Sequence, residues 1–150
     1  MENLKYARPD MSDEEVQGIA DLLGCYDIFS KLPHGYETPV GERGDSLSAG
    51  QQQLVSICRA MVAGPRILML DEATSSVDTR TELVIQHALE RLFEARTCFI
   101  VAHRLSTVRR ADQILVLDHG RTMERGTHEE LVARGGIYAG LHKQFMAVMS

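Results

Sequence analysis

An acidic pair, Asp71-Glu72, directly follows the apolar run Ile-Leu-Met-Leu at residues 67–70. Packed apolar side chains would desolvate two adjacent carboxylates, so a strand that ends in this pair needs a cation nearby. Magnesium bound to a nucleotide meets that need, with Asp71 holding the ion directly or through water. Glu72 is then placed to accept a proton from an attacking water. The alternative interpretation is a pair of solvated loop carboxylates.

The segment Leu-Ser-Ala-Gly-Gln at residues 47–51 is a second candidate site, because Ser48 precedes an apolar pattern of helical period. Unpaired amides and the helix dipole at a helix N-terminus attract anions such as phosphates. Gly50 lets the backbone approach a ligand, and Gln51 is a side-chain donor in the first turn. The alternative for Ser48 is an ordinary N-cap, since serine is a preferred N-cap residue.

Two more side chains are candidates. His103 follows an apolar strand pattern at 97–102, where it could donate a hydrogen bond to a terminal phosphate; a satisfied structural histidine is the alternative. Asp78 could act in the same site or be only a helix N-cap. The other histidines lack metal-ligand spacing and are interpreted as surface residues: His34, His87, His119, His128 and His142. No Gly-x-x-x-x-Gly-Lys-Ser/Thr phosphate loop occurs in the chain.

The elements that must position these residues follow from periodicity and from Pro and Gly positions. Capping boxes at Ser12–Glu15 and Thr127–Glu130 open two helices. Pro and Gly mark a loop at 32–44. Five helices are predicted. The first covers residues 13–23, and the second begins after the Ser48 cap and ends before Gly64. The others are residues 79–93, a short helix after Thr127, and residues 137–146. The predicted strands are 66–71, 97–102, 113–117 and a short one through Met123 after a turn at His119-Gly120. Residues 2–9 are expected to form neither helix nor strand, and to continue from a longer protein.

This order of elements predicts an α/β protein. Continuous apolar runs such as residues 98–102 are typical of strands in a parallel sheet that is covered on both faces. We predict a helical part at 1–63 and half of an α/β sheet domain at 64–150.

The composition of the 150-residue chain, with 44% hydrophobic and 25% charged residues, is that of an ordinary globular protein. A net charge of −5 argues against recruitment of nucleic acid or an anionic membrane by bulk electrostatics. No apolar stretch approaches the ~18 residues that span a bilayer, so membrane association would require a partner. An odd number of cysteines in apolar settings favours reduced thiols.

The motifs resemble, in their order, those of the nucleotide-binding domains of ABC transporters. Leu-Ser-Ala-Gly-Gln resembles the signature motif, residues 67–78 resemble Walker B and the D-loop, and residues 101–107 resemble the switch-histidine segment. The resemblance extends through residues 111–117 and 126–131, and residues 40–44 are similar to a loop of the exporter branch. It implies a P-loop NTPase-like fold with a partial parallel sheet and a helical subdomain on the N-terminal side.

The resemblance also implies roles for residues. Asp71 would coordinate Mg²⁺, Glu72 would be the general base, and His103 would contact the γ-phosphate of ATP. Asp78 would help to join two sites. The signature residues Ser48, Ala49, Gly50 and Gln51 would face the ATP held by a second nucleotide-binding domain. Glu42 and its neighbours would contact a transmembrane domain, which places the domain at the cytoplasmic face of a membrane.

Two departures from the family pattern bear on activity. Ala49 stands where the family usually has glycine, and Gln52 and Leu54 stand where arginines are frequent, which raises the possibility of a weakened site in a heterodimer. The family's phosphate loop, adenine-stacking aromatic and glutamine loop are expected before residue 1. The phosphate-loop strand would lie between strands 97–102 and 113–117, so its absence predicts an aggregation hazard.

Three hypotheses follow. In the first, the chain is the C-terminal portion of an ATPase domain that powers an ABC exporter, inactive by itself. In the second, it is an interaction module that offers its signature face to a partner ATPase. In the third, it is a DNA-maintenance ATPase, which the acidic balance and the lack of sustained heptads disfavour. The sequence does not reveal the transported substrate or whether the dimer is homo- or heteromeric.

Overall fold

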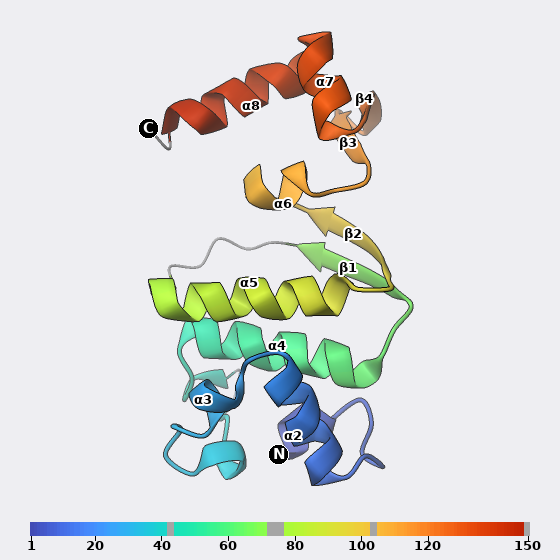
Figure 1. Cartoon of the computed structure of the whole chain (residues 1–150). Helices are drawn as coiled ribbons and strands as arrows, with labels where there is room; N and C mark the ends of the chain where they lie inside the picture. Colours follow the sequence, from blue (N-terminus) through green and yellow to red (C-terminus); the bar gives the residue numbers. More distant parts are fainter. Residues whose placement is uncertain (42–43, 72–76, 103–104, 149–150) are drawn as a thin grey trace. The chain divides into compact units, whose positions relative to one another are not determined.

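A computed structural model describes residues 1–41, 44–71, 77–102 and 105–148, and its backbone divides into two compact units (Figure 1). Unit 1 contains the described residues among 1–70 and 77–99, and unit 2 contains Asp71 and the described residues from Ile100 onward. Each unit has a hydrophobic core of its own. The predicted division after residue 63 follows motif positions rather than contacts, and it stays a prediction.

The helices of unit 1 confirm the three that periodicity predicts and add three short ones. They are α1 (Glu2–Lys5), α2 (Asp13–Leu22), α3 (Tyr26–Phe29), the 3₁₀ helix η1 (Gly35–Glu37), α4 (Ala49–Ala63) and α5 (Thr79–Phe93). α2 begins at the predicted capping box, in which Ser12 and Glu15 satisfy each other's backbone amides. α4 ends at Gly64, whose φ of 59° lies in the left-handed region that favours glycine.

The expectation that residues 2–9 lack a helix was wrong, because α1 forms there. Its Leu4 is only 5% exposed and belongs to the core of unit 1. The Arg59 side chain of α4 donates to the backbone and side-chain oxygens of Asn3, at 2.6 and 2.5 Å. A four-residue helix has no periodic sequence signal, so contacts distant in sequence decide this element.

Helices α4 and α5 pack side by side in unit 1 and run in the same direction (Figure 1). Their facing side chains are at most 4% exposed: Leu54, Ile57 and Cys58 on α4, and Ile85, Ala88 and Leu92 on α5. Cys58 and Cys25 are free thiols whose sulfurs lie 3.8 Å apart. Hydrogen bonding to Cys25 and burial raise the pKa of the Cys58 thiol, so this thiol stays protonated and packs as a small apolar group.

Strands β1 (Ile67–Asp71) and β2 (Thr97–Val101) pair with each other, and their arrows point the same way (Figure 1). One face packs on the core of unit 1 through Leu68, Leu70 and Cys98. The opposite face is open to solvent, with Ile67 61%, Met69 85% and Phe99 59% exposed. Unit 1 itself supplies a covering layer to one face only, and the two-sided cover that the apolar runs predict stays a prediction.

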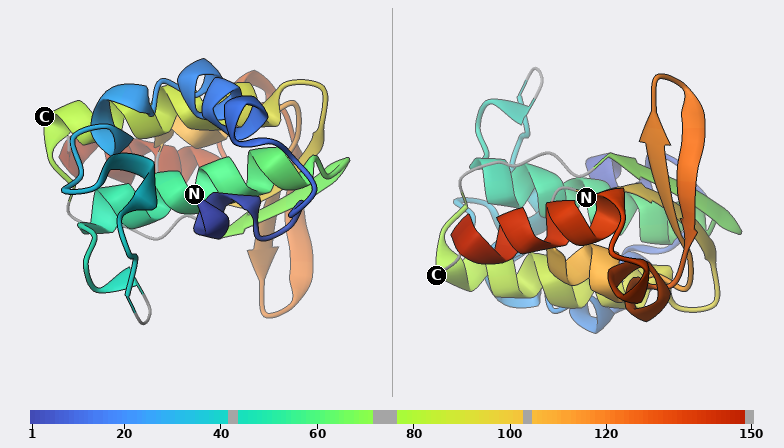
Figure 2. Two further views of the ribbon diagram at one scale, coloured as in Figure 1. Left: turned by 90° about the horizontal axis from the view of Figure 1, so that it is seen from below. Right: turned by 90° about the horizontal axis from the view of Figure 1, so that it is seen from above.

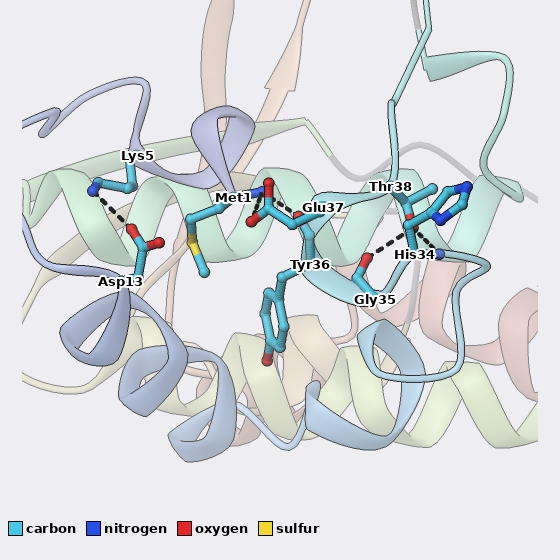
Figure 3. A network of polar contacts seen from close by, with 8 residues as sticks. All are labelled: Met1, Lys5, Asp13, His34, Gly35, Tyr36, Glu37 and Thr38. Carbon is cyan, nitrogen blue, oxygen red and sulfur yellow. Dashed lines mark hydrogen bonds and ion pairs between the residues drawn. The ribbon is translucent and has the colours of Figure 1, made fainter.

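Polar contacts connect the short helices and turns of unit 1 (Figure 3). The Lys5 ammonium lies 2.9 Å from the Asp13 carboxylate and so ties α1 to α2. Thr38 accepts from the His34 amide at 3.1 Å and donates to the Gly35 carbonyl at 2.8 Å, which closes the turn around η1. These contacts give structure to part of the segment that the sequence predicts only as a loop.

Unit 2 contains a hairpin and three helices. Its elements are α6 (Leu105–Arg109), β3 (Ile114–Asp118), β4 (Arg121–Gly126), α7 (His128–Arg134) and α8 (Ile137–Val148). β3 and β4 are antiparallel neighbours, which Figure 2 shows as two strands side by side. His119 and Gly120 both have positive φ, 45° and 73°, as a two-residue hairpin turn of type I′ requires. The predicted turn, both strands and the Thr127–Glu130 capping box are confirmed, whereas α6 was not predicted.

The interpretation of His128 and His142 as surface residues was wrong. Both are half-buried and pack on Tyr138, which is 5% exposed in the core of unit 2. The Nδ1 atom of His128 lies 2.7 Å from the Tyr138 hydroxyl. In the described parts of the chain, no helix is both long and apolar enough to cross a bilayer.

Candidate functional site

The start of α4 carries the first group of predicted site residues. Ser48 has extended backbone angles and its Oγ accepts from the Gln51 amide at 3.3 Å, while the Ser48 amide donates to Gln51 Oε1 at 2.9 Å. This reciprocal capping box leaves the amides of Ala49 and Gly50 as first-turn donors with no acceptor inside the helix. Ser48 and Ala49 are exposed, so an anion can reach the Ala49 amide, whereas Gly50 is buried.

Ser48 is therefore an N-cap, as its alternative interpretation held, and its cap geometry is compatible with anion binding as well. The Gln51 side chain uses its oxygen for the cap and keeps two N–H donors. The Ala49 methyl lies on the exposed first turn, where the family pattern has glycine.

Gly50 has a structural role that the sequence did not reveal. It is buried, and a Cβ atom on it would lie 2.5 Å from Thr81 Cγ2 and 2.8 Å from Val77 Cγ1. Real Cβ atoms essentially never approach other atoms within 3.0 Å. The missing side chain thus permits close packing between the starts of α4 and α5, and the structure offers this reason beside the predicted approach to a ligand.

Gln52 is a second residue whose role sequence analysis missed. Its side-chain amide donates to the carbonyl oxygens of Gly44 at 2.8 Å and Leu47 at 3.2 Å. Gly44 has a φ of 80°, so glycine suits this turn. The contacts hold the loop that leads into Ser48. Their only sequence signal is a glutamine one turn into a helix that follows a glycine-rich loop.

Asp78 caps the start of α5. Its Oδ1 accepts from the Thr81 amide at 3.0 Å, and this hydrogen bond is the main cause that lowers the pKa of the Asp78 carboxyl from 3.8. The carboxylate is therefore ionised near neutral pH and exposed to solvent. The sequence left the cap and a site role equally open; the cap is observed, and the role in joining two sites stays a prediction.

Asp71 is the last residue of β1 and is exposed. Within the described residues, no three His, Cys, Asp or Glu side chains gather into a group that could hold a metal ion. Mg²⁺ usually binds one or two carboxylates together with phosphates and water, so a single exposed carboxylate fits an ion that arrives with a nucleotide. The predicted general base Glu72, the predicted phosphate contact His103 and the predicted membrane-domain contact Glu42 lie outside the described residues.

The comparisons with known proteins identify the family of the chain. The sequence profile of the ABC transporter family matches residues 3–75. The ABC transporter ATP-binding protein YknV of Bacillus subtilis is 55% identical over 95% of this chain and 24% of its own length. An ATP-dependent lipid A-core flippase of Chromohalobacter salexigens is 48% identical over 94% of this chain and 24% of its own length.

The fold comparison extends the same result to three dimensions. A bacterial Atm1-family ABC exporter with ATP bound superimposes with a TM-score of 0.83 and 44% identity, covering 95% of this chain and 25% of that one. The fold is that of an ABC exporter nucleotide-binding domain, a P-loop NTPase fold. The chain belongs to the ABC transporter ATP-binding family, and it spans about a quarter of the length of these relatives.

Proposed function

We propose that this chain is the C-terminal portion of an ATP-hydrolysing nucleotide-binding domain that powers an ABC exporter. The observation that carries the proposal is the exposed, serine-capped start of α4, beside which Asp78 caps α5. Both helix starts belong to unit 1 and meet through Gly50. Membership of the ABC family supports ATP as the ligand.

The proposed roles divide among residues that the family pattern matches. Mg²⁺ bound with ATP supplies positive charge that stabilises the transferring phosphoryl group. Asp71 holds that ion through its exposed carboxylate, and Glu72 takes the proton of the attacking water. His103 donates to the terminal phosphate. Ser48, Ala49, Gly50 and Gln51 face the ATP of a second nucleotide-binding domain.

By itself the chain is proposed to be inactive. Its sequence contains no phosphate loop, so half of the groups that hold ATP have to come from elsewhere. The exposed apolar face formed by Ile67, Met69 and Phe99 supports the same view, because a parallel sheet is normally covered on both faces. We propose that the rest of the ATPase core supplies that cover.

The proposed partners are a second nucleotide-binding domain and a transmembrane domain, the latter contacted through the loop around Glu42. This arrangement places the chain at the cytoplasmic face of a membrane. Nucleic acid is not among the proposed partners, since the net charge is −5.

Hydrolysis of Mg-ATP by the protein at the full length its gene encodes is the test. We expect Glu72→Gln to lower the rate by about 10²–10⁴-fold, because a general base contributes that much. Glu129→Gln is the matched control, since Glu129 is exposed on α7 and outside the proposed site. Equal rates for the wild type and Glu72→Gln would contradict the proposal. Hydrolysis by the 150-residue chain alone would contradict its proposed inactivity.

A parallel binding measurement tests the interaction-module hypothesis. The 150-residue chain is incubated with an intact nucleotide-binding domain of the family, with and without ATP. ATP-dependent binding that Ser48→Arg abolishes would favour a module that offers its signature face, whereas no binding in either condition removes that hypothesis.

A further inference from the structure

Thr81 touches both of the helix starts that carry predicted site residues. Its backbone amide donates to the Asp78 carboxylate at 3.0 Å. Its methyl group, Cγ2, occupies the space beside Gly50, where an added Cβ atom would lie only 2.5 Å away. One residue of α5 thus contacts the first turn of α4 and also fixes the cap of its own helix.

The packing of the two helices leaves little freedom for this contact to adjust. α4 and α5 run in the same direction and share a core of side chains that are nearly inaccessible to solvent (Figure 1). Close-packed interiors respond to an extra methyl group by shifting whole elements. The distance between the starts of α4 and α5 is therefore set where Gly50 meets Thr81 and Val77.

We propose that Thr81 is a positioning residue, which holds the serine-capped start of α4 and the Asp78 cap of α5 as one rigid pair. The proposal rests on the function proposed for the site, because the paired helix starts are the groups that would face nucleotide. It assigns the missing side chain of Gly50 to helix packing. It also gives a role to Thr81, which no motif assignment covers, and a packing role to Val77 in the segment that resembles the D-loop.

Substitution of Gly50 tests the packing step. In Gly50→Ala the new methyl group overlaps Thr81 Cγ2 and Val77 Cγ1. We expect hydrogen exchange to accelerate about tenfold or more at the two capped amides, Gln51 at the start of α4 and Thr81 at the start of α5, as overpacking of this size predicts. Gly18→Ala is the matched control, since Gly18 lies within α2 and a Cβ atom there meets nothing within 4 Å. Amide hydrogen exchange in Gly18→Ala should be as slow as in the wild type or slower.

Rescue variants separate positioning from a general loss of stability. Thr81→Ser keeps the amide and the hydroxyl but lacks Cγ2, and Val77→Ala lacks Cγ1. We expect the triple variant G50A/V77A/T81S to recover slow exchange at both helix starts. Thr81→Val keeps a methyl group at the point of overlap, so G50A/T81V should stay unprotected.

The decisive readout compares rescue of exchange with rescue of activity, in the protein at the full length its gene encodes. We expect the triple variant to hydrolyse Mg-ATP about tenfold faster than Gly50→Ala, in parallel with its recovered protection. In Gly50→Ala, rapid exchange confined to α4 would overturn the proposal. In the triple variant, recovered protection without recovered activity would also overturn it, because Gly50 would then serve the ligand. If the wild type hydrolyses no ATP, the proposed function fails, while the exchange measurements still decide whether Thr81 positions the two helices.

Discussion

Glu124 on β4 accepts a hydrogen bond from the backbone amide of Tyr138 in the first turn of α8, at 2.9 Å. Its second carboxylate oxygen accepts from the amide of Ile137 at 2.8 Å. A side chain from a strand thus satisfies two of the four amides that a helix start leaves without intrahelical acceptors. This contact joins the hairpin of unit 2 to its last helix.

Removing that carboxylate is expected to loosen α8. Glu124→Ala leaves both amides without the charged acceptor, so we expect it to lower the free energy of unfolding by about 1–3 kcal/mol. Glu124→Gln keeps one acceptor oxygen and should lower it by less. Hydrogen exchange at Ile137 and Tyr138 measures the effect, and unchanged protection in Glu124→Ala would show that the contact does not hold the helix.

Ala95, between α5 and β2, has a φ of 57°, a conformation that is unfavourable for any residue with a Cβ atom. We expect Ala95→Gly to raise the free energy of unfolding by about 0.5–1 kcal/mol, because relief of the strain exceeds the entropy that glycine adds to the unfolded chain. Ala133→Gly, on exposed helical backbone of α7, should have the opposite sign. Urea denaturation of the two variants measures both shifts, and destabilisation by Ala95→Gly would refute the prediction.

Ser48 offers a way to separate capping from ligand binding. Ser48→Ala removes the cap oxygen and is expected to lower the free energy of unfolding by about 1 kcal/mol. Ser48→Asp keeps a good cap and therefore the stability, but it puts a negative charge where the proposed phosphate lies. We expect hydrolysis to fall in both variants and stability to fall only in the first. An active Ser48→Asp variant would argue against a phosphate at the start of α4.

The Asp78 cap makes the start of α5 sensitive to acid. Its pKa is lowered from 3.8 in the folded chain, so the stabilisation it provides is complete above the unfolded value and is lost as the pH falls through the folded value. We expect NMR to give a titration midpoint below 3.8 for the Asp78 carboxyl. The hydrogen bond from the Thr81 amide to Asp78 should weaken over the same pH range. Asp78→Asn, which caps without titrating, should remove this acid-dependent step. A midpoint at or above 3.8 contradicts the observed hydrogen bond.

The open face of the β1–β2 sheet is expected to make the isolated chain aggregate. Met69 is 85% exposed on that face, whereas its neighbour Leu68 is 7% exposed and packs in the core. Met69→Lys should reduce aggregation, measured by light scattering, without loss of helical signal. Leu68→Lys should unfold unit 1 because it buries a charge. Equal scattering by the wild type and Met69→Lys would show that this face is not responsible.

Sequence predictions were accurate where residues close together in the chain decide the structure, and they failed where distant residues do. The helix at 79–93, the capping boxes and the hairpin turn at His119-Gly120 were confirmed because residues a few positions apart decide them. The helix α1 and the half-buried His128 could not be predicted, since partners distant in the chain or in another helix hold them. Among the site residues, Ser48 and Asp78 could be recognised as helix caps from local pattern alone.

The sequence by itself determined the family, the order of the motifs and the chemistry available at each, because motif spacing and residue type carry that information. Only the tertiary structure showed that the starts of α4 and α5 lie against each other. It also showed that Thr81 occupies the space that a side chain on residue 50 would need. It also decided which face of the β1–β2 sheet stays open. The physical reason is that close packing between segments depends on the shapes of both partners, which no single stretch of sequence contains.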